Sequence, residues 1–99
     1  MSRYSVSATR SAAKALKTLP KGARARIAVA ISALADDPRP HGHKTLDGKK
    51  KLYRIRVGAY RVVYQVRDGE LIVLIIRVGD RKEVYRRLAE LMKRTDPPA

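Results

Sequence analysis

The chain has 99 residues, of which 23 are Lys or Arg and 9 are Asp or Glu, so its formal net charge is +14. A chain of this length forms one hydrophobic core. It contains no Trp, Phe or Cys, which makes that core aliphatic and excludes disulfide scaffolds, thiol nucleophiles and Cys-based zinc sites. The strong positive charge argues against a basic partner and favours a nucleic acid.

The first residues, MSRYSVSATR, contain no apolar signal segment, and no stretch is long enough to cross a bilayer. The helical patterns near the N-terminus are rich in Ala rather than in the large apolar residues that bind a membrane surface. We therefore expect a cytoplasmic protein without a membrane partner.

The first third of the chain predicts a short strand and two antiparallel helices. The strand covers residues 3–6 and leads into a helix that Ser7 or Thr9 can cap and that Pro20 ends. A second helix is expected over residues 21–35, with apolar side chains along one stripe. No acidic residue occurs in this part of the sequence, so the helical hairpin is basic throughout.

The middle of the chain predicts strands. Residues 36–51, with two prolines and two glycines, are expected to form a loop. Three β-rich runs follow, separated by Gly58-Ala59 and by Asp68-Gly69, and the latter pair is a strong two-residue hairpin signal. The runs cover residues 52–57, 60–66 and 71–78.

A last helical pattern covers residues 82–94, and residues 95–99 are expected to be a flexible tail. The sequence contains no repeat. It therefore predicts a single α+β domain over residues 1–94. In this fold an N-terminal antiparallel helical hairpin packs on a small, mostly antiparallel four-stranded sheet, and a helix closes the chain.

Side chains alternate across a strand, and this alternation gathers arginines on one side of the sheet. With a two-residue turn after Val57, Arg56 lies directly across from Arg61, and Arg54 shares their face. Opposed like charges destabilise a sheet by roughly 0.2–1 kcal/mol, and a phosphate bound between the guanidinium groups would offset that cost. The other reading is a solvated strand face whose arginines splay apart. We call the side of the sheet that carries these three residues the arginine face.

The same register, continued through the second turn, places Arg61 opposite Ile76 and Val63 opposite Leu74. Aliphatic residues then share the arginine face, so part of it needs cover from the C-terminal helix or from a partner.

Beyond the third run, Gly79 permits a sharp exit from the sheet. This exit would bring Arg81 and Tyr85 back toward the arginine face. Tyr85 is equally explained as an ordinary surface tyrosine.

The two histidines, His41 and His43, lie close together in the expected loop. Without cysteines or a carboxylate cluster beside them, they are better explained as solvated loop residues than as metal ligands. The acidic residues of the loop suit turns and caps equally well. We expect neither a metal ion nor a cofactor. These acidic residues are Asp36, Asp37 and Asp47.

Four segments share their residues and order with a known family: YRIR at 53–56, GAYRVVYQV at 58–66, VGDR at 78–81 and EVY at 83–85. Together with the helical hairpin and the closing helix, they make the chain similar to the RelE/ParE superfamily of bacterial toxins, most closely to its RelE branch. The resemblance covers almost the whole chain.

The resemblance implies a toxin of a type II toxin-antitoxin system that enters the A site of the 70S ribosome and cleaves the mRNA there. In the reaction that it implies, the ribose 2′-hydroxyl attacks the adjacent phosphate and expels the 5′-oxygen of the next nucleotide, without a metal. It also implies a cognate acidic antitoxin, which forms a hetero-oligomer with the toxin and binds operator DNA.

Position by position, the resemblance implies an active site of four arginines and one tyrosine. Lysine is common in the family at the first two positions, and arginine does not act as a base. We therefore assign the base to the tyrosine, whose phenolate the cations would stabilise. The site residues are Arg54, Arg56, Arg61, Arg81 and Tyr85.

In this interpretation Arg56 and Arg61 hold the phosphate and Arg81 assists the leaving oxygen. Further contacts to the RNA backbone are expected from four lysines of the loop: Lys44, Lys49, Lys50 and Lys51.

Two alternatives stay open. A ParE-like toxin would share the fold but act on DNA gyrase, and a non-catalytic protein would bind the ribosome or RNA through the same phosphate contacts.

Overall fold

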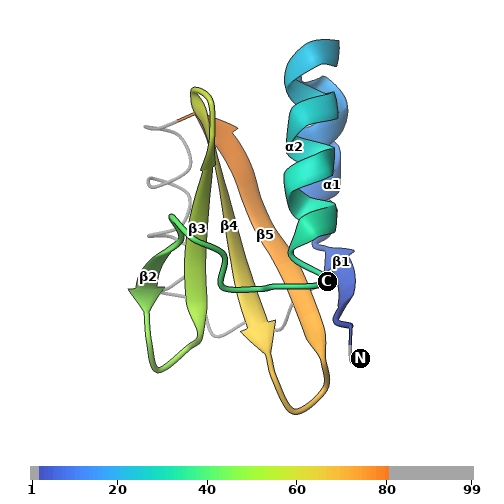
Figure 1. Ribbon diagram of the computed structural model, residues 1–99. Helices are drawn as coiled ribbons and strands as arrows, with labels where there is room; N and C mark the ends of the chain where they lie inside the picture. The colour runs from blue at the N-terminus through green and yellow to red at the C-terminus, as the bar shows by residue number, and fades with distance from the viewer. Residues whose placement is uncertain (1–2, 81–99) are drawn as a thin grey trace.

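The computed structural model describes residues 3–80, which form one five-stranded sheet with two helices on one face (Figure 1). The strand order is β1-β5-β4-β3-β2; β1 runs parallel to β5, and all other neighbours are antiparallel. The elements are β1 (Ser5–Ala8), α1 (Arg10–Thr18), α2 (Lys21–Ala33), β2 (Lys44–Asp47), β3 (Leu52–Val57), β4 (Tyr60–Arg67) and β5 (Ile72–Asp80).

The predicted α+β class and the basic helical hairpin are confirmed. Thr9 caps α1, because its Oγ1 accepts a hydrogen bond from the backbone N–H of Ala12 at 3.1 Å. The same hydroxyl donates to the carbonyl of Ile76 at 3.2 Å, which ties the start of α1 to β5. Pro20 separates the two helices at the N-cap of α2.

The core lies between the helices and the face of the sheet opposite the arginine face. Ile27 and Leu34 from the second helical segment are fully buried against Val62 and Tyr64 of β4. The hydroxyl of Tyr64 donates to the carbonyl of Pro38 at 2.7 Å. Burial raises the pKa of this phenol above its usual range, so the hydroxyl stays protonated as a donor.

The chain between α2 and β2 crosses the sheet on the helical side (Figure 1). Arg39 of this segment donates to both carboxylate oxygens of Asp68, at 3.1 and 2.9 Å, and its guanidinium lies 5.0 Å from the centre of the Tyr53 ring. The hydroxyl of Tyr4 donates to the same carboxylate at 2.8 Å. The hydrogen bonds from Arg39 and Tyr4 lower the pKa of Asp68 to about 2, so this carboxylate carries a negative charge. We call the contacts of Arg39 and Tyr4 with Asp68 the clasp.

The sheet has five strands instead of the four predicted. The additional strand is β2, which lies in the segment 36–51 that was predicted as a loop. Its sequence, KTLD, has one apolar residue, so neither alternation nor β-propensity marks it. The first strand covers Ser5–Ala8 instead of residues 3–6, and the predicted C-terminal helix lies outside the described residues.

The pairing of β4 with β5 also differs from the prediction. The connection after Arg67 takes four residues instead of two, with Leu71 at a φ of 55°, and a bulge lies between Val63 and Tyr64. The longer connection and the bulge together shift the register of β5 where it runs beside Arg61 and Val63. Arg61 therefore lies opposite Gly79, and not opposite Ile76 as predicted. Val63 likewise pairs with Arg77 instead of Leu74.

Within residues 3–80, no helix is both long and apolar enough to span a membrane.

We predict that Tyr64→Phe lowers the free energy of unfolding by about 1–3 kcal/mol, because it leaves the carbonyl of Pro38 without its hydrogen bond at a buried position. Urea unfolding monitored by circular dichroism would measure the change. Tyr60→Phe is the control, since Tyr60 is only partly buried. Equal stability of the two variants would contradict the role given to the hydroxyl.

Candidate nucleic-acid interface and active site

The predicted arginine pair is present at the tip of the β3–β4 hairpin. Val57 pairs with Tyr60, and Arg56 lies directly opposite Arg61, as the two-residue turn predicted. Arg56 is exposed, whereas Arg61 is only 7% exposed. A buried guanidinium and an exposed one thus face each other, and a bound anion would relieve their repulsion.

Glycine lies on the other side of Arg61. The register shift brings Gly79 of β5 opposite Arg61, so no side chain projects beside the guanidinium from that strand. On this side, the neighbour of Arg61 is therefore backbone alone. The sequence does not predict that Gly79 lies beside Arg61, because this pairing depends on a bulge for which the sequence carries no recognisable signal.

Arg54 lies two residues further along β3, between Lys44 of β2 and Val63 of β4. Its Nε is buried and has no hydrogen-bond partner among residues 3–80. A buried arginine N–H left without a partner is costly, and the cost falls on a residue of the arginine face.

The arginine face lacks counterions in the described part of the chain. No carboxylate of residues 3–80 forms an ion pair with Lys44, Arg54, Arg56 or Arg61. These four cations therefore produce a local positive potential, which raises the concentration of a polyanion at this face.

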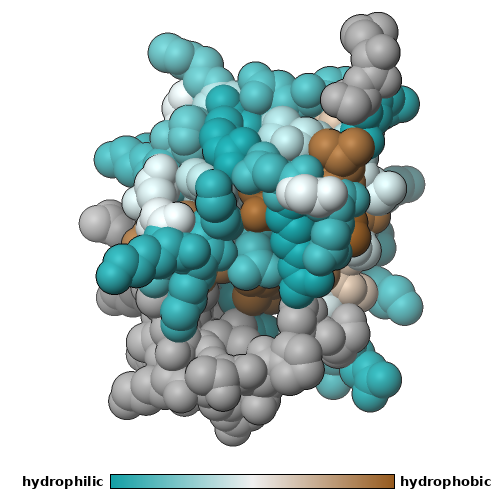
Figure 2. All heavy atoms as spheres, turned by 90° about the horizontal axis from the view of Figure 1, so that it is seen from below, coloured by the Kyte–Doolittle hydropathy of each residue, from teal (hydrophilic) through white to brown (hydrophobic). Residues whose placement is uncertain are grey.

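The other predicted RNA contacts lie away from this cluster. Lys49, Lys50 and Lys51 form the β2–β3 turn, at the opposite end of β3 from Arg56. Figure 2 shows this end of the molecule as mostly hydrophilic. Lys51 Nζ lies 3.7 Å from Oδ2 of Asp68 in the clasp, so the charge of Lys51 is partly neutralised. Of the four predicted lysines, the structure brings only Lys44 to the arginines.

Arg81 and Tyr85 lie outside the described residues. Asp80, the residue before Arg81, pairs with Tyr60 at the end of the sheet that carries the arginine pair. The convergence of Arg81 and Tyr85 on Arg56 and Arg61 stays a prediction.

The two histidines differ in their surroundings. His43 Nδ1 lies 2.8 Å from the carbonyl of Pro40, and its ring packs edge-on against Tyr53. His41 is exposed. Within the described range, no three His, Asp or Glu side chains gather in a way that could hold a metal ion.

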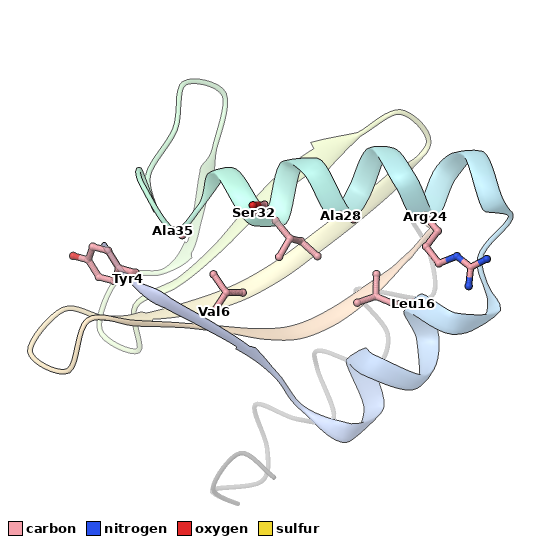
Figure 3. Close-up of a pocket in the computed structure, with 8 residues that line it drawn as sticks. Tyr4, Val6, Leu16, Arg24, Ala28, Ser32 and Ala35 are labelled. Carbon is pink, nitrogen blue, oxygen red and sulfur yellow. The ribbon is translucent and has the colours of Figure 1, made fainter. Parts of the chain in front are cut away.

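A second surface is an apolar groove of about 480 Å³ between β1, α1 and α2. Val6 and Leu16 extend from β1 and α1 toward α2, and Arg24 lies at one end (Figure 3). Val6 is 36% exposed. Within residues 3–80, the outer edge of β1 pairs with no other strand, so the groove runs beside an open sheet edge.

Comparisons with known proteins assign the family. The family model described as the ParE toxin of type II toxin-antitoxin systems, parDE, matches residues 3–85. A RelE-like toxin protein of Escherichia coli is 34% identical over 95 residues, which covers 92% of this chain and 99% of that protein. The toxin RelE of Mycobacterium tuberculosis is 36% identical over 84 residues, which covers 84% and 87%.

A solved structure agrees with these relatives. The crystal structure of the RelE–RelB complex from Pyrococcus horikoshii has a TM-score of 0.74 and 30% identity, over 81% of this chain and 97% of that one. The chain therefore belongs to the RelE/ParE superfamily of toxins of type II toxin-antitoxin systems. Within this superfamily, its relatives place it with the toxins of RelBE-type systems.

We predict that Arg56→Gln raises the free energy of unfolding by up to about 1 kcal/mol at low salt, because it removes the like charge opposite Arg61. Inorganic phosphate should stabilise the wild type more than this variant. Thermal unfolding with and without phosphate measures both effects. Arg10→Gln, an exposed position outside the sheet, is the control, and equal phosphate stabilisation of wild type and Arg56→Gln would contradict the prediction.

Proposed function

We propose that this toxin is a ribosome-dependent endoribonuclease that cleaves mRNA in the A site and so stops translation. The observation that carries the proposal is the Arg56–Arg61 pair, which lies on an arginine face without described counterions and beside Gly79. The relatives named RelE support the same class of activity.

The proposed reaction is an internal transesterification. The ribose 2′-oxygen forms a bond to the adjacent phosphorus, the bond from phosphorus to the 5′-oxygen breaks, and a 2′,3′-cyclic phosphate results. The nucleophile belongs to the RNA, so the scheme needs no metal-bound water. The ribosome would hold the strand in line for attack, and such orientation is worth a large part of the barrier.

Each site residue has a proposed role. The guanidinium groups of Arg56 and Arg61 hold the non-bridging oxygens as the phosphate gains charge. Arg54 extends this contact along the RNA strand. Tyr85 takes the proton of the 2′-hydroxyl. Arg81 stabilises the charge on the departing 5′-oxygen, which takes its proton from water.

We predict that Arg61→Ala lowers the rate of cleavage of ribosome-bound mRNA by about 100-fold or more, because one donor to transition-state charge contributes roughly 3–4 kcal/mol. Tyr85→Phe and Arg81→Ala should cause losses of similar size. Primer extension on programmed ribosomes measures the rate, and the chemistry of the new RNA end identifies the cyclic or 3′-phosphate product.

Arg67→Ala is the matched control, since Arg67 lies at the other end of β4 and pairs with Glu70. Arg61 is buried, so thermal unfolding of each variant must be compared, and Arg61→Lys separates loss of charge from loss of the planar fork. Wild-type rates in Arg61→Ala and Tyr85→Phe would refute the proposed site.

The match to the ParE model favours one second candidate, a toxin that acts on DNA gyrase. Expression in cells distinguishes the two functions. Rapid arrest of translation with cut mRNA supports the nuclease, whereas a DNA damage response with intact mRNA supports the gyrase inhibitor. A third outcome, RNA binding without new RNA ends, would indicate a non-catalytic RNA-binding protein.

We also propose that an acidic antitoxin binds this chain, as RelB does in the Pyrococcus horikoshii complex. The groove between β1, α1 and α2 offers the antitoxin an apolar floor, and the surrounding hairpin carries basic side chains without a single acidic one. An amphipathic segment with acidic flanks is complementary to both features. The antitoxin in turn would connect the complex to operator DNA.

We predict that Val6→Glu lowers the affinity for the cognate antitoxin about tenfold, because it places a carboxylate on the apolar floor that an acidic partner would cover. Val29→Glu on α2 is the control; Val29 is 72% exposed and does not line the groove. Isothermal titration calorimetry measures both. Equal affinities of the two variants would place the antitoxin elsewhere.

A further inference from the structure

Arg26 of α2 lies against the turn that carries the arginine pair. A Cβ atom built on Gly58 would lie 3.9 Å from Arg26 Nη2, so the guanidinium reaches the β3–β4 turn from the helical side. Gly58 has a φ of +61°, a conformation that glycine adopts without strain. The helix thus presents a cation to the tip of the hairpin.

Arg26 has no counterion among residues 3–80. Its side chain is exposed, and within residues 3–80 it takes part in none of the ion pairs. Acidic residues are absent from both helices. The cation therefore adds to the potential of the arginine face instead of being neutralised.

The short separation between Gly58 and Arg56 places Arg26 near the proposed active site. Gly58 follows Arg56 by two residues, which is about 7 Å along a strand, and Arg56 lies opposite Arg61. Three guanidinium groups thus follow one another from the arginine face around the hairpin tip to α2. A row of separate cations suits a polymer that carries one phosphate per nucleotide.

We propose that Arg26 binds a phosphate of the RNA strand next to the scissile one, so that the substrate bends around the β3–β4 turn. This inference rests on the proposed ribonuclease function and adds a positioning residue to it. The contact is to the backbone, so it contributes affinity and register without selecting a base.

The antitoxin is a less suitable partner for Arg26. The groove is lined on α2 by positions such as Arg24, Ala28 and Ser32, which follow one another at helical spacing. Arg26 is two residues from Arg24 and from Ala28, roughly 200° around the helix from each. It therefore points away from the groove and toward the hairpin tip.

The test measures binding of an RNA that carries a 2′-deoxy group at the cleavage position and so cannot be cut. For Arg26→Ala we expect an affinity about fivefold to tenfold lower, and a plot of log affinity against log salt whose slope is shallower by about 0.7, the value of one single-stranded phosphate contact. Cleavage of ribosome-bound mRNA should show a higher KM and a kcat within about twofold of wild type. Arg26→Lys should keep the slope.

Arg10→Ala is the matched control. Thr9, just before it, bonds to Ile75, at the level of Tyr64 and Tyr53 in the sheet. Gly58 lies five residues further along β3, roughly 17 Å away. Arg10 is exposed, so the charge change is the same. Its variant should bind RNA with the wild-type slope.

The possible results distinguish failure of this inference from failure of the proposed nuclease function. Wild-type affinity and slope in Arg26→Ala, with normal cleavage by the wild type, would overturn this inference and leave the proposed nuclease function standing. Loss of antitoxin binding with unchanged RNA affinity would assign Arg26 to the protein partner and overturn it too. A wild type that neither binds nor cleaves RNA would refute both proposals.

Discussion

Two guanidinium groups repel each other across the β3–β4 hairpin, and the packing on the other face of the same strands keeps them together. The register joins six residue pairs, and Ile55, Val62 and Tyr64 are buried against the helices. Burial of one such side chain contributes about 1.5–3 kcal/mol, whereas the opposed charges cost roughly 0.2–1 kcal/mol. The free energy gained by burial therefore exceeds the cost of the repulsion, and the packing holds Arg56 and Arg61 side by side.

Three carboxylates of the described residues pair with cations that lie away from the arginine pair. Asp68 and Glu70, in the turn between β4 and β5, pair with nearby cations at the end of the sheet opposite the arginine pair. Asp36, beyond α2, pairs with Arg3. These three anions thus neutralise cations away from the arginine pair, and no carboxylate of residues 3–80 pairs with Lys44, Arg54, Arg56 or Arg61.

The sequence predicts the parts of this arrangement that depend on local rules. The two-residue turn at Gly58-Ala59 and the alternation of side chains give the Arg56–Arg61 pair, and helical spacing gives the basic hairpin. What could not be predicted depends on distant partners. Strand β2 forms because β3 offers it a partner, and Gly79 reaches Arg61 through a bulge. The bond from Arg39 to Asp68 joins residues 29 positions apart, beyond the reach of local patterns.

The parallel pairing of β1 with β5 has a consequence for synthesis of the protein. Ser5 pairs with Ile72 and Ala8 with Ile75, and Thr9, which caps α1, bonds to Ile75 and Ile76. β1 therefore cannot join the sheet before β5, the last described strand, is available to pair with it. Contacts so distant in sequence form late, so β1 stays unpaired until β5 has been synthesised, and a nascent chain shorter than this cannot complete the sheet.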